Sequence, residues 1–167
     1  HASRLTDQLL SLERAKGRPD KNLFEHCDLN QIARRVCERN FEAIMRQGTD
    51  LGFQPYDTLL NVEVDSLLIQ EAVQNLIDNA VKHAGPDNTE IFVRVGANDG
   101  NGIIQVSDKG TGLNSSDSDV AFSRFGQIEP SDGSGLGMAI VREIAELHGG
   151  AANIEESETG ATISLII

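Results

Sequence analysis

Four polar side chains recur along one apolar stretch of the sequence at the spacing of an α-helix. Glu71, Asn75, Asn79 and Lys82 are separated by four, four and three residues, which places them on one face of a helix predicted over 65–84. A charged stripe is normally a solvated helix face, but asparagine is a poor helix former in mid-helix. Two asparagines, Asn75 and Asn79, on one helix face therefore favour a ligand contact. Side-chain carbonyl oxygens suit a hard cation such as Mg²⁺, and Lys82 would then reach phosphate groups.

A carboxylate followed by two glycines lies where a predicted strand ends. Asp108 precedes Gly110 and Gly112, and glycines at such a place let the backbone turn sharply or approach a ligand closely. A buried carboxylate there would accept a hydrogen bond from an amino group. Taken alone, this pattern is more often a simple turn.

A second glycine-rich segment, 133–137 (GSGLG), leads directly into an apolar-striped helix predicted over 136–148. The N-terminus of a helix offers unpaired N–H groups and the positive end of the helix dipole, which together suit phosphate oxygens. Without other signals the segment is equally a flexible loop with a helix cap. The P-loop and the Rossmann fingerprint are disfavoured, because no Lys-Ser or Lys-Thr follows the glycines and no strand immediately precedes them.

The elements that must position these residues follow from apolar periodicity and turn residues. Helices are predicted at 1–16, from Asp28 to about Met45, and at the two ranges given above, and a linker is predicted at 17–27. Strands are predicted near 50–54, 59–64, 91–95, 103–106, 151–155 and 161–167. This mixture of strands and helices indicates an α/β or α+β fold.

Composition limits the classes of function. With 167 residues and 39% hydrophobic content, the chain can bury a core of one domain, and it has no apolar run of membrane-spanning length. A net charge of −12 argues against nucleic acid as a partner, since phosphate backbones are bound by clustered Lys and Arg. Cys27 and Cys37 lack the spacing of a metal site, so reduced thiols in a cytoplasmic protein are expected.

Four motifs in a fixed order resemble those of the GHKL superfamily of ATPases and kinases. NLIDNAVKH at 75–83 resembles the N box, and DKGTG at 108–112 resembles the G1 box. FSRF at 122–125 looks like the F box of bacterial sensor histidine kinases, and GSGLGMAIV at 133–141 looks like the G2 box. The conjunction is far more specific than any one motif.

The resemblance implies a Bergerat-type ATP-binding fold, a two-layer α/β (α+β) sandwich. A mixed sheet of about five strands would pack on three helices, with an N-terminal helix stub beside them. The catalytic ATP-binding domain would span 28–167, with an ATP lid at about 113–133. The stub at 1–16, which contains SRLTDQLLSLE, resembles the second helix of a dimerisation and phosphotransfer hairpin.

The resemblance also assigns an adenine end to the site. Asp108 would accept the adenine amino group, and Gly110 and Gly112 would shape the base pocket. His83 would lie near the ribose or base, and Thr162 would add a polar contact beneath the adenine.

A phosphate end is implied on the other side. Asn75 and Asn79 would hold Mg²⁺, Lys82 would contact phosphate, and Arg124 is a further phosphate candidate. The remaining implied nucleotide contacts come from the glycine-rich loop: Gly133, Ser134, Gly135, Leu136 and Gly137.

In related kinases the γ-phosphoryl group of ATP passes to a histidine on a dimeric helical hairpin and then to a response-regulator receiver domain. His1, His26, His83 and His148 lack the sequence context of that histidine, so the acceptor is expected outside this chain. The resemblance implies a homodimeric parent protein in which this domain is cytoplasmic and an anchor lies in the bacterial inner membrane.

Two alternatives stay open. Glu71 lies four residues before Asn75, where hydrolysing members of the superfamily carry the acidic residue that activates water, so a GHKL ATPase is one alternative. The other is a regulatory module that binds nucleotide without transferring phosphate.

Overall fold

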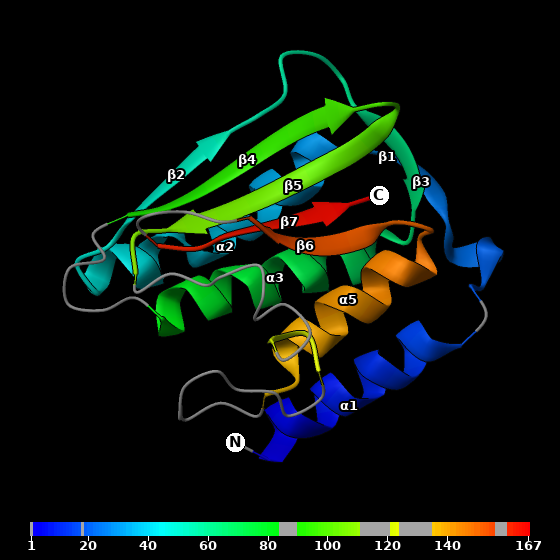
Figure 1. The fold of residues 1–167 in the computed structure, drawn as a ribbon, viewed down its shortest axis with the longest axis horizontal. Helices are drawn as coiled ribbons and strands as arrows, with labels where there is room; N and C mark the ends of the chain where they lie inside the picture. The colour runs from blue at the N-terminus through cyan, green and yellow to red at the C-terminus, as the bar shows by residue number, and fades with distance from the viewer. Residues whose placement is uncertain (1, 18, 84–89, 111–120, 124–134, 156–159) are drawn as a thin grey trace.

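The computed structural model describes residues 2–17, 19–83, 90–110, 121–123, 135–155 and 160–167 (Figure 1). In this part of the chain a mixed five-stranded sheet packs on helices α2 (Leu29–Arg46), α3 (Ser66–Lys82) and α5 (Gly137–Leu147). The predicted two-layer architecture is therefore confirmed. The strands, in their spatial order, are β2 (Asp50–Gln54), β4 (Glu90–Asn98), β5 (Asn101–Asp108), β7 (Thr162–Ile166) and β6 (Ala151–Glu155).

The centre of the sheet is the β4–β5 hairpin. Its two-residue turn, Asp99 and Gly100, has positive φ at both positions (51° and 83°), the geometry that matches the twist of paired strands. β5 continues antiparallel to β7, and β7 to β6, whereas β2 runs parallel to β4 at the edge. Alternate residues of the hairpin, such as Val93 and Ile104, are fully buried toward the helices.

Aspartates cap two of the three helices on the sheet. Asp28 Oδ1 accepts from the N–H of Asn30 at 3.1 Å, and Asp65 Oδ1 accepts from the N–H groups of Leu67 and Leu68 at 3.1 and 3.2 Å. Helix α5 begins without a side-chain cap among the described residues. This difference matters for the site, because Gly137, the first residue of α5, lies against Asn75 of α3.

The segment predicted as a linker, 17–27, contains regular structure. It forms a short 3₁₀ helix, η1 (Lys21–Leu23), and most of β1 (Glu25–Asp28), which pairs antiparallel with β3 (Asn61–Val64). β3, predicted as a strand over 59–64, therefore leaves the large sheet and forms a separate two-stranded sheet. A four-residue strand next to a helix cap has too little alternation to be read from sequence.

The N-terminal helix predicted over 1–16 is observed as α1 (Ala2–Lys16), which packs along α5 (Figure 1). Leu12 and Ala15 are buried in this contact, at 0% and 4% exposure. Among the helices of the described residues, none combines the length and the hydropathy that crossing a bilayer requires.

Candidate functional site

The polar face of α3 meets the beginning of α5 at Asn75. This side chain is 7% exposed, and its Nδ2 donates to the carbonyl oxygen of Glu71 at 3.0 Å. Its Oδ1 points the other way, and it would lie 3.1 Å from a Cβ placed on Gly137. Within the described residues this oxygen accepts no hydrogen bond. A buried acceptor of this kind needs a partner, and an amide oxygen is a ligand that fits Mg²⁺.

The N-terminus of α5 presents its backbone to the same place. Gly135 has φ +68°, a left-handed conformation that favours glycine, and Leu136 follows it with its side chain fully buried. The Leu136 carbonyl accepts from the N–H of Ile140 at 2.9 Å, which closes the first turn. The N–H groups of that first turn have no acceptor within the helix, so this end attracts an anion.

A second polar centre lies at the end of β5, where Asp108 is 8% exposed. Its Oδ1 accepts from the N–H of Gly110 at 2.8 Å and from the N–H of Ala161 at 3.3 Å. Burial raises the pKa of this carboxyl, while the two N–H donors and the nearby His83 act in the opposite direction. Oδ2 has no hydrogen-bond partner among the described residues, so it is left for a donor on a ligand.

Two glycines let the backbone close around Asp108. A Cβ on Gly110 would collide with the carbonyl oxygen of His83, which is the C-cap of α3. A Cβ on Gly160, whose φ is +78°, would collide with the carbonyl oxygen of Asp108 itself. The end of α3, the end of β5 and the start of β7 therefore meet at backbone contact distance.

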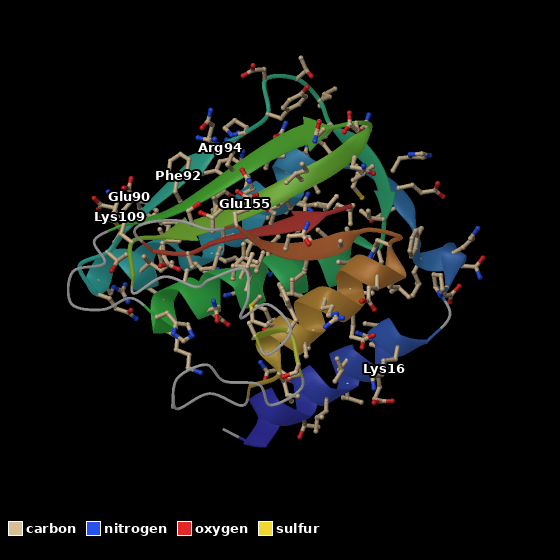
Figure 2. All side chains as sticks on the ribbon, in the orientation of Figure 1. Lys16, Glu90, Phe92, Arg94, Lys109 and Glu155 are labelled. Atoms are coloured by element: carbon tan, nitrogen blue, oxygen red, sulfur yellow. The ribbon has the colours of Figure 1, made fainter. Side chains whose placement is uncertain are left out.

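An ion pair supports the strand end beside this centre. Lys109, the residue after Asp108, places its Nζ 2.7 Å from Glu90 Oε2, and both side chains are exposed at the start of β4 (Figure 2). The pair fastens β5 to β4 where the sheet ends, on the outside of the molecule. It contributes about 1 kcal/mol or less, because the charges are solvated.

The two centres are joined by α3. Eight residues separate Asn75 from His83, which corresponds to about 12 Å along the helix axis. Asn79 is half-buried and Lys82 is exposed on the same face between them, as their spacing predicts. The structure thus brings Asn75 together with Gly137 near the middle of α3. At the C-terminal end of α3 it brings His83 together with Asp108 and Gly110.

Thr162 does not join this group. It pairs with Ser107 across β5 and β7, and the two hydroxyl oxygens are 2.9 Å apart. Because successive residues of a strand point to opposite faces, Ser107 and Thr162 lie on the open face of the sheet and Asp108 on the helix-covered face. The predicted contact of Thr162 beneath an adenine is not supported by this placement.

Sequence reasoning missed the residues that hold Asp108 from β7, namely Gly160 and the N–H of Ala161. A glycine directly before a predicted strand was the available signal. Four predicted site residues lie outside the described residues, as does nearly all of the predicted lid: Gly112, Arg124, Gly133 and Ser134.

Comparison with known proteins shows the family to which the chain belongs. The sequence pattern of the family described as "Histidine kinase-, DNA gyrase B-, and HSP90-like ATPase" matches residues 64–167, which include both centres. The chain belongs to this family. The order of the four motifs had indicated the same superfamily, and that recognition is confirmed.

Several members of the family that resemble the chain are named histidine kinases. The methanogenesis regulatory histidine kinase FilI of Methanothrix harundinacea (strain 6Ac) is 41% identical over 106 residues, which are 62% of this chain and 12% of FilI. The histidine-protein kinase/phosphatase MprB of Mycobacterium sp. (strain KMS) is 33% identical over 142 residues, 83% of this chain and 27% of MprB. The chain thus spans a minor part of either relative.

A solved structure shows the same fold. The nucleotide-free catalytic domain of histidine kinase ThkA superposes with a TM-score of 0.77 at 27% identity, covering 86% of this chain and 94% of that domain. The described fold is therefore that of a histidine kinase catalytic domain in the ATPase family.

Proposed function

We propose that this chain is the Mg·ATP-binding catalytic domain of a sensor histidine kinase. The observation that carries the proposal is the buried Asn75 Oδ1, which faces the uncapped N-terminus of α5. An amide oxygen beside the N-terminus of a helix suits a cation that is itself bound to phosphate oxygens. Asn75 and Asn79 would hold Mg²⁺, and Lys82 and the amides of 135–137 would bind phosphates.

The adenine would bind at the C-terminal end of α3, beside His83. Asp108 Oδ2 would accept from the adenine amino group, while Oδ1 stays fixed by the N–H groups of Gly110 and Ala161. A ligand bound to both centres must span about 12 Å, which favours an extended nucleotide over a smaller anion.

The reaction we propose is transfer of the γ-phosphoryl group of ATP to a histidine. Positioning and charge stabilisation are what a protein contributes to phosphoryl transfer, and Mg²⁺ would supply most of the positive charge in so acidic a chain. The acceptor would lie on a dimeric helical hairpin, of which α1 would form the second helix. Among the described histidines, His83 belongs to the adenine end and both ring nitrogens of His148 are hydrogen-bonded.

The partner that would receive the phosphoryl group is the receiver domain of a response regulator. ThkA has been crystallised in complex with the response regulator protein TrrA, and that kinase superposes on 99% of this chain with a TM-score of 0.78 at 25% identity. A homodimeric parent protein with an inner-membrane anchor remains a prediction.

Calorimetry tests nucleotide binding first. The chain should bind ATP in a Mg²⁺-dependent manner, and Asn79→Ala should weaken binding mainly when Mg²⁺ is present. Asn153→Ala is the matched control, because Asn153 is exposed on β6 at the far edge of the sheet. A folded chain that fails to bind Mg·ATP would refute the proposal.

Transfer is tested by adding a hairpin protein that carries the acceptor histidine, with γ-labelled ATP. Acid-labile label on the hairpin supports the kinase. Steady release of phosphate that is lost in Glu71→Ala would instead indicate an ATPase. Tight binding with neither transfer nor hydrolysis would indicate a regulatory nucleotide-binding module.

A further inference from the structure

His148 joins three segments at the end of the molecule away from the Asn75–Gly137 contact, which is called the phosphate centre below. It is the C-cap of α5, and its Nε2 accepts a hydrogen bond from the N–H of Asp65, the N-cap of α3, at 3.1 Å. Because Nε2 is an acceptor, the ring proton is on Nδ1, which donates to the carbonyl oxygen of Ile144 at 2.7 Å. With both nitrogens bonded, the orientation of the ring is fixed.

The face of that ring is covered by the segment that follows α1 in the chain. Phe24 stacks on His148 with ring centroids 4.8 Å apart and an interplanar angle of 17°. The next residue, Glu25, accepts at Oε1 from the hydroxyl of Ser66, the first residue of α3, at 3.1 Å. Two consecutive residues thus contact the end of α5 and the start of α3.

The packing of α3 against α5 links this contact to the candidate site. Ten residues lead from Asp65 to Asn75 on α3, about 15 Å, and eleven lead from His148 back to Gly137 on α5, about 16.5 Å. The helices pack side by side in opposite directions, so these similar lengths join the His148–Asp65 contact to the Asn75–Gly137 contact. A shift of one helix along the other at the first contact is reproduced at the second.

We propose that His148 is a positioning residue, which sets the register of α5 against α3 and transmits the position of Phe24 to the phosphate centre. The inference rests on the proposed function in one respect, that the Asn75–Gly137 contact binds Mg·ATP. Displacing Phe24 from the His148 ring would alter the Asn75–Gly137 contact, although Phe24 itself would touch no ligand.

The first test uses the nucleotide-free chain and NMR. The Asn75 side-chain amide and the Gly137 backbone amide should shift in Phe24→Ala and in His148→Leu. They should stay unchanged in Phe41→Ala and His26→Gln, which replace exposed side chains on α2 and β1. Unchanged resonances in Phe24→Ala would overturn the inference, even if His148→Leu does not fold.

The second test measures Mg·ATP affinity in the same variants. Phe24→Ala and His148→Leu should each weaken binding by about two- to tenfold, and the double variant should be no weaker than His148→Leu alone. His148→Gln should recover most of the loss, since its amide oxygen can accept from the N–H of Asp65. Equal losses in His148→Gln and His148→Leu would overturn the hydrogen-bond role. If the unaltered chain binds no ATP, the proposed function fails, while the resonances still decide this inference.

Discussion

Replacing Asp108 with asparagine would separate the roles of its two carboxylate oxygens. Oδ1 accepts from the N–H groups of Gly110 and Ala161, and an asparagine oxygen can keep both bonds. The amide nitrogen then occupies the place of Oδ2 and presents N–H groups instead of an acceptor. An adenine amino group bound there would face a donor.

The expected loss of Mg·ATP affinity follows from that exchange. A hydrogen bond to a charged acceptor contributes about 1.5–3 kcal/mol, and a donor facing a donor adds a desolvation penalty, so we expect about 3 kcal/mol, or roughly 100-fold. The free protein should not be destabilised. Burial raises the pKa of Asp108, which means that the folded state penalises the charge that asparagine removes.

Calorimetry with Mg·ATP and thermal unfolding without nucleotide check the two halves of this prediction. The variant should also lose its preference for ATP over inosine triphosphate, whose 6-oxo group accepts where adenine donates. Asp99→Asn is the control, because Asp99 lies in the β4–β5 turn at positive φ, which asparagine tolerates. Unchanged ATP affinity in Asp108→Asn would refute the assignment, and loss of folding would show that the charge is structural.

Three further predictions concern backbone contacts and pH. Gly137→Ala would place its Cβ 3.1 Å from Asn75 Oδ1, so calorimetry should show about tenfold weaker Mg·ATP binding, while the free energy of unfolding stays equal or rises by up to about 1 kcal/mol. Gly160→Ala forces alanine to φ +78° and against the Asp108 carbonyl, so denaturant unfolding should show a loss of about 3 kcal/mol. Burial lowers the pKa of His148 below its ordinary 6.5. Between the lowered pKa and 6.5, the unfolded chain therefore binds a proton at this residue that the folded chain does not. That part of the stability is complete above about pH 6.5 and falls as the pH drops toward the folded pKa, and thermal unfolding of His148→Gln should show a weaker acid dependence.

Features that depend on local periodicity could be predicted from the sequence. The polar stripe of α3 lies on one face because its spacing is helical, and Asp65 caps that helix because a short acceptor precedes an apolar run. The β4–β5 hairpin follows from Asp99 and Gly100 between alternating strands. These elements carry Asn75 and Asp108, and the structure shows both side chains to be buried.

Contacts between residues far apart in sequence could not be predicted in this way. Ala161 reaches Asp108 across 53 positions, and β1 pairs with β3 over 33 to 39 positions, so no local pattern contains either contact. The position of Thr162 depends on register, since a shift of one residue moves a side chain to the opposite face. The sequence therefore predicted the candidate side chains of the site better than it predicted the backbone groups that hold them.

The charge of the protein explains why backbone groups matter here. A chain of net charge −12 repels a polyanion at long range, and on the polar face of α3 that carries Asn75 and Asn79 the cationic side chain is Lys82. At the proposed phosphate site, where Asn75 meets the start of α5, binding would depend on dipoles instead: the N-terminus of α5 would attract phosphates, and the amide oxygen of Asn75 would attract the cation bound to them. A dipole acts only at short range and only when it points at the ligand. The effect of these dipoles would therefore depend on the register of α5 against α3. If the proposed function is correct, the affinity for nucleotide should therefore depend on how α5 packs against α3.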